Sequence, residues 1–394
     1  MEPWHSQQYL EAGRKAGISE EVIKRAIATA QRTLMRPNHG PPILTLGHLA
    51  DYSGVELGRL RAYVARTGQD PYREFTIRKR PITGTKPRFR FIAVPEPRLL
   101  QVQKWIAKEI LNRASCHAAS TAFSPGSRLI SAAAIHCDAQ WIVKVDVRNF
   151  FESITEIDAH RVFCERGYQP LVAFELARLC TRLRDKHRHS DSYVPQKRRP
   201  KNCAWSNESI YPHTLIGTLP QGAPTSPMLA NLAVSNMDEA LSKLAQVFSL
   251  RYSRYADDLT FSSRSKSFGC ARAAHAIGKI YKILVNSGLS PNYAKTTVIS
   301  PGSRNIVLGL LVDGEHPRLS REFRSNLRMH LYFIAHPNYG PTQHAKARGF
   351  ASVEGLRQHL LGLIAFASQI DPIYGDRCRM EMRKADWRVV FDDT

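Results

Sequence analysis

The spacing of apolar residues changes several times along the chain. Through residues 1–70 they recur at helical spacing, which predicts a helical N-terminal segment. From Tyr72 the pattern becomes alternating. Residues 75–80 and 88–94 read as two strands around the turn-forming segment 82–87, so a β-hairpin is expected there. Apolar residues then return to one side of a helix predicted from Arg98 to Asn112.

The middle of the chain combines a buried strand with long helical segments. Trp141–Asp146 is a short apolar run ending in an acid, which is typical of a buried strand. One amphipathic helix is expected from Glu156 to about Arg182. An exposed basic loop should follow it to about Tyr211. The Pro/Gly loop 219–227 is then predicted to lead into a helix that continues to Val247.

A second hairpin is predicted around two adjacent acids. The β-prone runs Phe248–Tyr252 and Leu259–Phe261 flank Asp257 and Asp258, so both carboxylates should lie at the turn. The remaining expected elements are a helix at 270–288, strands at 296–299 and 305–312, and a mostly helical region over 320–387.

Three acids in this pattern suggest a metal site. Asp257 and Asp258 raise each other's pKa unless a cation lies between them, and a divalent ion is the simplest relief. Oxygen ligands suit Mg²⁺. An isolated Asp-Asp pair is more often a solvated turn. Asp146, at the end of the predicted buried strand, supplies a third carboxylate that can reach the same sheet edge, and this set favours the metal site.

The net charge of the chain indicates which class of molecule it binds. The 394-residue chain has 56 Lys and Arg against 34 Asp and Glu, a net charge of +22. Such an excess favours a polyanion, most commonly a nucleic acid. No apolar run approaches the roughly 18 residues that a membrane-spanning helix needs, so no membrane partner is expected. Six Lys or Arg and no acid occur from Arg78 to Arg90. They fit either a phosphate-binding surface or a solvated edge strand.

The number and spacing of cysteines and the N-terminal residues indicate the cellular compartment. Seven cysteines are scattered without a Cys-x-x-Cys pair, so neither a disulfide framework nor a zinc site is indicated. Residues 1–5 lack the basic and apolar regions of a signal peptide. We expect a cytoplasmic protein with reduced thiols.

Four motifs together resemble a known family. They are Val145–Ile154, Leu219–Pro227, Tyr255–Asp258 and Asn292–Thr296, and they occur in the order found in bacterial reverse transcriptases of the retron and defence-associated kind. The resemblance covers roughly residues 70–370. It implies an α+β right-hand polymerase whose palm contains an antiparallel sheet and a catalytic hairpin. The implied divisions are a helical N-terminal extension at 1–70, fingers at 71–140 and 155–218, palm at 141–154 and 219–312, and a helical thumb at 313–394.

The resemblance also implies roles for individual residues. Asp146, Asp257 and Asp258 would be catalytic and, with the Val147 carbonyl, would hold two Mg²⁺ ions, for which Mn²⁺ could substitute. Substrate-binding positions carry over as follows: Phe151 as a gate against the ribose 2′-hydroxyl, Gln221 in the nucleotide pocket, Arg90 with Arg78 or Lys79 at the triphosphate, and Lys295 near the leaving group.

Two departures from the retron pattern stand out. Ala132–His136 keeps the His of the retron Asn-Ala-x-x-His element but lacks its Asn. Val307–Gly309 reads Val-Leu-Gly where retron enzymes have Val-Thr-Gly. In the family these elements are associated with recognition of a structured RNA. Together with the long basic loop before residue 211, they favour another bacterial group, such as the defence-associated enzymes.

The resemblance implies an RNA-directed DNA polymerase that copies an associated noncoding RNA and acts in anti-phage defence. Its partners would be that RNA as template or scaffold, deoxynucleotides, the DNA product and an effector protein. Two alternatives remain open: a polymerase of the same fold that is template-independent or protein-primed, and a non-catalytic RNA-binding scaffold. The intact set of three acids argues against the scaffold.

Overall fold

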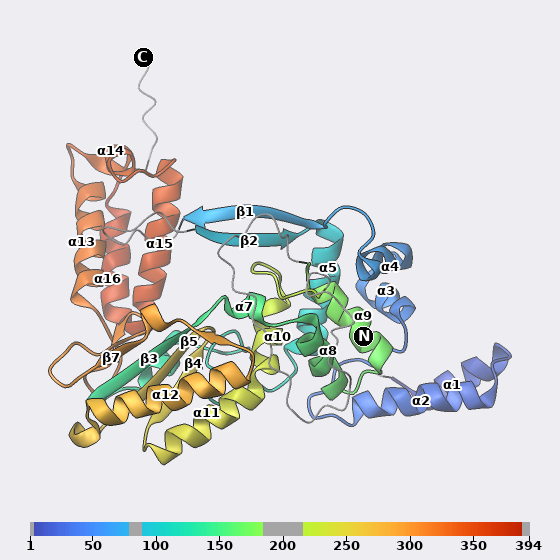
Figure 1. Ribbon diagram of the computed structural model, residues 1–394. Helices are drawn as coiled ribbons and strands as arrows, with labels where there is room; N and C mark the ends of the chain where they lie inside the picture. Colours follow the sequence, from blue (N-terminus) through green and yellow to red (C-terminus); the bar gives the residue numbers. More distant parts are fainter. Residues whose placement is uncertain (1–3, 79–88, 184–215, 388–394) are drawn as a thin grey trace.

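The computed structural model describes residues 4–78, 89–183 and 216–387. Along its length the molecule has N-terminal helices at one end, a central sheet with flanking helices, and a helical bundle at the other end (Figure 1). Lys79 and the basic loop predicted up to Tyr211 fall outside the described residues, apart from the start of that loop. The side chain of Arg78 falls outside them as well.

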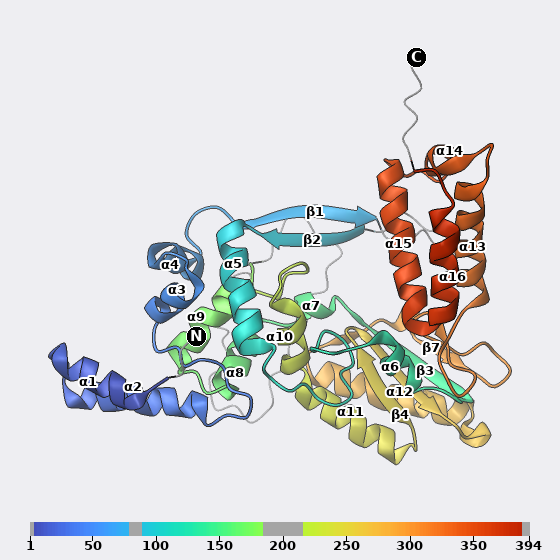
Figure 2. The same cartoon turned by 180° about the vertical axis from the view of Figure 1, so that it is seen from behind.

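The expected N-terminal helices are present. They are α1 (Ser6–Lys15), α2 (Glu20–Leu34), α3 (Leu46–Ser53) and α4 (Leu57–Ala65). α1 and α2 project from the end of the molecule, whereas α3 and α4 lie against the central region (Figures 1 and 2). Gly54 ends α3 with a left-handed φ of 66°, a conformation that glycine adopts without a steric penalty.

The first predicted hairpin is formed by β1 (Tyr72–Arg78) and β2 (Phe89–Pro95). The strands pair antiparallel, from Tyr72 opposite Pro95 to Arg78 opposite Phe89. β2 leads into α5 (Pro97–Ile106), which continues as a π-helical turn, Ala107–Leu111. The hairpin runs above the central sheet in the direction of the C-terminal bundle (Figure 1).

A five-stranded sheet forms the centre of the molecule. Its strands are β3 (Trp141–Arg148), β4 (Arg251–Tyr255), β5 (Asp258–Ser263), β6 (Ser290–Pro291) and β7 (Thr297–Ile299). Their order is β4-β5-β3-β6, and β7 also pairs with β3. β3 is thus the central strand, and its apolar residues are buried as the sequence predicts. The helices α11 (Ser235–Val247) and α12 (Cys270–Asn286) lie along the sheet (Figures 1 and 2).

The predicted single helix from Glu156 to Arg182 is wrong. The segment forms α8 (Glu156–Glu165) and α9 (Pro170–Cys180), which pack against each other. Gly167 reverses the chain between them with a φ of 93°. A Cβ at Gly167 would lie 2.6 Å from the Arg32 carbonyl oxygen, so this turn closely approaches the end of α2.

Two other expected elements are also divided. The helix predicted to end at Val247 is interrupted near Val234, giving α10 (Ser226–Ala233) before α11. The strand predicted at 305–312 is a tight hairpin, β8 (Ile306–Val307) and β9 (Leu310–Leu311). Its turn consists of Leu308 and Gly309, with φ of 51° and 82°. β10 (Arg318–Leu319) pairs with β9.

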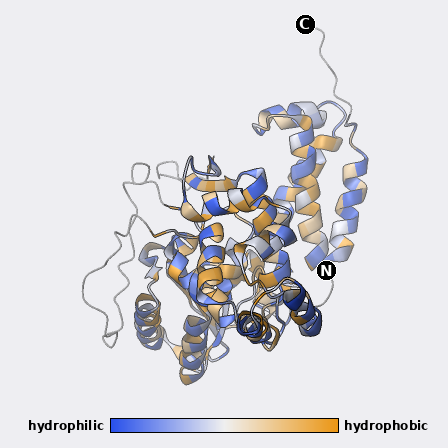
Figure 3. Ribbon diagram, turned by 90° about the vertical axis from the view of Figure 1, so that its right-hand side faces the viewer, coloured by the Kyte–Doolittle hydropathy of each residue, from blue (hydrophilic) through white to orange (hydrophobic). Residues whose placement is uncertain are grey.

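The C-terminal region is a helical bundle whose core also takes in residues of β8–β10 and Ile142 on β3. It contains α13 (Arg321–Ala335), α14 (Gly340–Ala347), α15 (Val353–Ile370) and α16 (Pro372–Arg383). Buried apolar side chains such as Leu327, Leu356 and Leu360 form this core, separate from the larger core around the sheet. Hydrophobic and hydrophilic residues alternate around the bundle helices (Figure 3). Within the described residues, no helix is long and apolar enough to cross a membrane.

Candidate active site

The three predicted acids meet at one end of the sheet. Asp146 on β3 lies directly opposite Asp258 on β5 in the antiparallel register. Asp257 precedes Asp258 in the turn, and its carbonyl oxygen accepts a hydrogen bond of 2.9 Å from the Val147 amide. The structure therefore brings together carboxylates that are 111 positions apart in the sequence, as the motifs predicted.

The turn that carries Asp257 is short. Tyr255 pairs with Asp258, so only Ala256 and Asp257 connect β4 to β5. Ala256 has a φ of 57°, a left-handed conformation that is uncommon for a residue with a Cβ. Surrounding contacts must hold such a turn in place.

Asp146 is held by two residues from the segment after β6. Asn292 donates from its side chain to Asp146 Oδ1 at 2.8 Å, and the Asn292 amide donates to the Asp146 carbonyl at 2.8 Å. Lys295 Nζ lies 2.7 Å from Asp146 Oδ2. Lys295 thus forms an ion pair with one of the acids. The contact of Asn292 was not predicted, although its position was part of a recognised motif.

Burial and mutual repulsion raise the pKa of two of the acids. Burial is the main cause of the raised pKa of Asp257, with a smaller contribution from the charge of Asp146. Asp258 keeps contact with solvent at the sheet edge. Even so, partial burial and then the charges of Asp257 and Asp146 raise its pKa to about 6. Arg90 on β2 opposes the shift of Asp257, so its charge reaches the acids from the hairpin.

The donor set suits a hard divalent cation. The available ligands are carboxylate oxygens, and a bound cation would offset the burial and mutual repulsion that raise the pKa of Asp257 and Asp258. Among the residues that the structure describes, no three His, Cys, Asp or Glu side chains converge closely enough to form a ready-made metal cluster. Lys295 instead supplies positive charge at Asp146.

A group of aromatic residues includes two phenylalanines that follow the strand carrying Asp146. Asn149, with a φ of 48°, starts the short helix α7 (Phe150–Ser153). Phe150 is buried in the main core, whereas Phe151 is only partly buried. The ring of Phe123 lies 6.1 Å from that of Phe151 and 6.3 Å from that of Tyr255. Phe123 was not singled out from the sequence.

The Pro/Gly loop before α10 contacts the β1–β2 hairpin. The Ala93 amide donates to the Gln221 carbonyl oxygen at 2.8 Å. Gly222 has a φ of 123°, and a Cβ there would lie 2.8 Å from the Ala93 carbonyl oxygen. Gln221 lines a small pocket with residues that include Phe91 and Glu152. The loop that carries Gln221 is thereby fixed against the hairpin.

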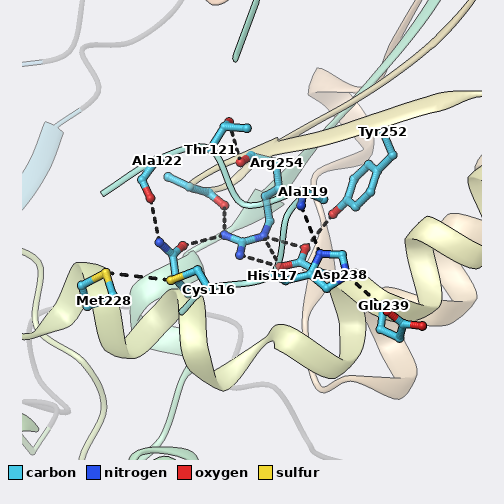
Figure 4. A network of polar contacts seen from close by, with 12 residues as sticks. Cys116, His117, Ala119, Thr121, Ala122, Met228, Asp238, Glu239, Tyr252 and Arg254 are labelled. Carbon is cyan, nitrogen blue, oxygen red and sulfur yellow. Dashed lines mark hydrogen bonds and ion pairs between the residues drawn. The ribbon is translucent and has the colours of Figure 1, made fainter. Parts of the chain in front are cut away.

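A buried arginine lies behind the turn (Figure 4). Arg254, which is fully buried, donates to both carboxylate oxygens of Asp238, from Nε at 2.9 and 3.2 Å and from Nη2 at 2.7 Å. Its Nη1 donates to Asn231 Oδ1 at 3.0 Å and to the Ala256 carbonyl at 3.1 Å. This network was not predicted, because its members come from α10, α11 and the end of β4.

His136, which belongs to the first of the two departures from the retron pattern, is fully buried. Its ring nitrogens lie 2.8 Å from Ser262 Oγ and 2.7 Å from Ser253 Oγ. It therefore connects the segment after α6 (Leu129–Ala134) to β4 and β5. In this chain its contacts are internal to the protein.

Comparisons with known proteins agree with this geometry. The family model described as "Reverse transcriptase (RNA-dependent DNA polymerase)" matches residues 77–324. The Retron Ec86 reverse transcriptase of Escherichia coli is 28% identical over 342 residues, covering 86% of this chain and 93% of that protein. The Retron Mx65 reverse transcriptase of Myxococcus xanthus is 29% identical, covering 93% and 80%.

Two further matches are more partial. The Retron Mx162 reverse transcriptase of Myxococcus xanthus is 28% identical over 83% of this chain and 64% of its own length. Among solved structures, telomerase from Candida albicans in complex with a telomeric RNA fragment covers 81% of this chain and 57% of that chain. Its identity of 11% and TM-score of 0.38 are too low to define the fold.

Proposed function

This chain belongs to the reverse transcriptase family and is a retron-type RNA-directed DNA polymerase, and from that premise we propose that Asp146, Asp257 and Asp258 hold two Mg²⁺ ions for nucleotidyl transfer. The observation that carries this proposal is the register of β3 and β5, which sets Asp146 opposite Asp258 and next to Asp257. The raised pKa values of Asp257 and Asp258 support it, because a bound cation would relieve their repulsion.

Each site residue has a role in this proposal. Such ions, when bound, activate the attacking hydroxyl and stabilise the charge on the leaving pyrophosphate. Asn292 and Lys295 orient the carboxylate of Asp146, and the Val147 carbonyl completes the ligand set. Mn²⁺ has the same preference for oxygen ligands and is expected to substitute.

We further propose how the incoming nucleotide is bound. Arg90 approaches the acids from β2 and, with Arg78 or Lys79, contacts the triphosphate through charge-assisted hydrogen bonds. The loop of Gln221, held against β2, forms part of the nucleotide pocket. Phe151, which is partly buried on α7 just after the acid-bearing strand β3, excludes the ribose 2′-hydroxyl by its bulk.

The proposed architecture is a right hand. The five-stranded sheet with α11 and α12 corresponds to the palm, over 141–154 and 219–312. The β1–β2 hairpin with α5, α6, α8 and α9 corresponds to the fingers, over 71–140 and 155–218. The bundle α13 to α16, within 313–394, corresponds to the thumb, and residues 1–70 form a helical extension.

We propose an associated noncoding RNA as template or scaffold, and anti-phage defence with an effector protein as the biological role. The net charge of +22 supports a nucleic-acid partner held largely through phosphates. The departures at Ala132–His136 and Val307–Gly309 concern which RNA is recognised. That they separate this chain from standard retrons stays a prediction, as does its location in the cytoplasm.

One experiment tests the polymerase site. The protein is purified with its co-expressed RNA, supplied with Mg²⁺ and deoxynucleotides, and the product is sequenced. We expect DNA complementary to the RNA from the wild type and none from Asp257→Ala/Asp258→Ala. Equal product from both would refute the proposed site. Homopolymer or repeat DNA would instead indicate template-independent synthesis, and DNA attached to protein would indicate protein priming.

A further inference from the structure

Phe123 has an unfavourable conformation for its residue type. It lies in the loop between the π-helical turn and α6, with a φ of 65° and a side chain that is 41% exposed. Non-glycine residues rarely adopt this left-handed conformation, and they persist in it where surrounding contacts impose it, often at functional sites. The main core does not require so exposed a ring. The conformation therefore calls for another explanation.

The ring of Phe123 lies beside the proposed nucleotide gate. It is 6.1 Å from the ring of Phe151 and 6.3 Å from that of Tyr255, whose neighbour across the sheet is Asp258. Phe151 also contacts Phe150, at 5.6 Å. Phe151 is thus flanked by a buried ring and by the ring of Phe123.

The loop of Phe123 is fixed by the same buried network as the catalytic turn. Asn231 donates to the Ala122 carbonyl at 2.7 Å, and the Thr121 amide donates to the Arg254 carbonyl at 2.9 Å. Arg254 donates both to Asn231 and to the Ala256 carbonyl, immediately before Asp257. The position of Phe123 relative to the acids is therefore set by fully buried side chains. Figure 4 shows this link between Ala122, Thr121 and Arg254.

We propose that Phe123 is a positioning residue for Phe151 and thereby determines how strongly ribonucleotides are rejected. The proposal rests on the gate role given to Phe151 under the proposed function. A gate excludes a hydroxyl only if its ring cannot turn aside, and Phe123 packs against that ring. Asn231 and Arg254 keep Phe123 in place in spite of its strained backbone.

The test measures selection between sugars. The full-length protein extends a DNA primer on an RNA template, and the ratio of kcat/KM for a deoxynucleotide to that for the matching ribonucleotide is determined. Phe151→Ala should lower this ratio strongly. Phe123→Gly should lower it by about tenfold, a discrimination typical of a lost packing contact, through a lower ribonucleotide KM. Its kcat with the deoxynucleotide should stay near that of wild type.

Four controls separate positioning from folding. Glycine suits a φ of 65°, so the Tm of Phe123→Gly should not fall. Phe123→Leu, which keeps an apolar side chain, should have an intermediate ratio. Phe174→Ala removes a ring that is 40% exposed on α9 and should leave the ratio unchanged. Because Phe123 acts through Phe151, the double variant Phe123→Gly/Phe151→Ala should be no less selective than Phe151→Ala alone.

The outcomes distinguish the two proposals. If Phe151→Ala relaxes selection but Phe123→Gly and Phe123→Leu do not, the inference about Phe123 is wrong and the gate remains. If Phe123→Gly weakens the use of both sugars equally, its role is structural and the inference is also wrong. If Phe151→Ala leaves the ratio unchanged, the proposed gate fails, and the inference fails with it.

Discussion

At the scale of single residues, Arg254 connects the loop of Thr121, helix α11 and the turn that carries Asp257. It is fully buried with Asp238 and also holds the Ala256 carbonyl. A buried ion pair often stabilises a fold no more than apolar residues of similar shape would. Its contribution here is geometric, because it fixes the turn that carries Asp257.

Removing one partner of this pair should be costly. We expect Arg254→Met to lower the free energy of unfolding by about 3–5 kcal/mol, because Asp238 would be left charged and buried. Urea unfolding measures this. Arg254→Met/Asp238→Leu should recover part of the loss. Arg264→Gln, which alters an exposed pair with Asp138 at 3.6 Å, should change stability by less than about 0.5 kcal/mol. An equally small change in stability for Arg254→Met would contradict this role of the Arg254–Asp238 pair.

His136 should make stability depend on pH. Burial, and then the charges of Arg251 and Lys144, lower its pKa from 6.5 to about 3. Between these values the unfolded chain binds a proton that the folded chain does not, so stability falls as pH drops below about 6.5. From pH 8 to 5.5, wild type should lose about 1.4 kcal/mol more unfolding free energy than His136→Gln. Parallel pH curves would show that His136 is not responsible.

The sequence identifies residues whose chemistry can be inferred from the short motif around them. Asp146, Asp257 and Asp258 stand in short motifs at predicted strand ends, so their meeting could be anticipated. Phe123 and Arg254 could not be assigned in this way, because their roles depend on which segments become neighbours. A left-handed φ at Phe123 has no signal in the residue type, since Phe does not favour it.

At the scale of elements, the loop before α10 joins two parts of the site. Gln221 accepts a hydrogen bond from Ala93, and Gly222 leaves no room for a side chain against β2. The Pro/Gly composition predicted a loop, but its docking on β2 depends on the fold. In the same way, apolar periodicity continues across the breaks at Gly167 and Val234, so the two long helices were predicted without their interruptions.

Gly222→Ala tests this docking. The added Cβ would lie 2.8 Å from the Ala93 carbonyl oxygen, and the φ of 123° is strained for alanine. We expect a loss of about 1–3 kcal/mol in unfolding free energy and a higher KM for deoxynucleotides. Gly278→Ala is the matched control, since its Cβ meets no atom within 4 Å on α12. It should stabilise the protein by up to about 1 kcal/mol and leave KM unchanged. A normal KM for Gly222→Ala would argue against the docking.

At the scale of the whole molecule, the buried apolar residues form two cores. The larger core holds the sheet and its helices, and the smaller one holds the bundle α13 to α16. The sequence predicted the helical character of this region, where Arg321, Arg324 and Arg328 recur at near-helical spacing. It could not show which of these arginines serve the fold. In the structure Arg324 binds Asp371 on the cap of α16 and lies 4.6 Å from the Tyr374 ring, whereas Arg321 and Arg328 are exposed.

This difference predicts how each arginine affects nucleic-acid binding. Phosphate contacts release counterions, so the affinity for a template–primer duplex should fall steeply with salt. Arg321→Gln and Arg328→Gln should each reduce the slope of log K against log[salt] by about 1, with little change in Tm. Arg324→Gln should mainly lower Tm, because it loses Asp371. Arg25→Gln on α2, at the opposite end of the molecule, should change neither quantity (Figure 1). Equal slopes for wild type, Arg321→Gln and Arg328→Gln, measured by fluorescence anisotropy, would exclude this face of α13 from the duplex-binding surface.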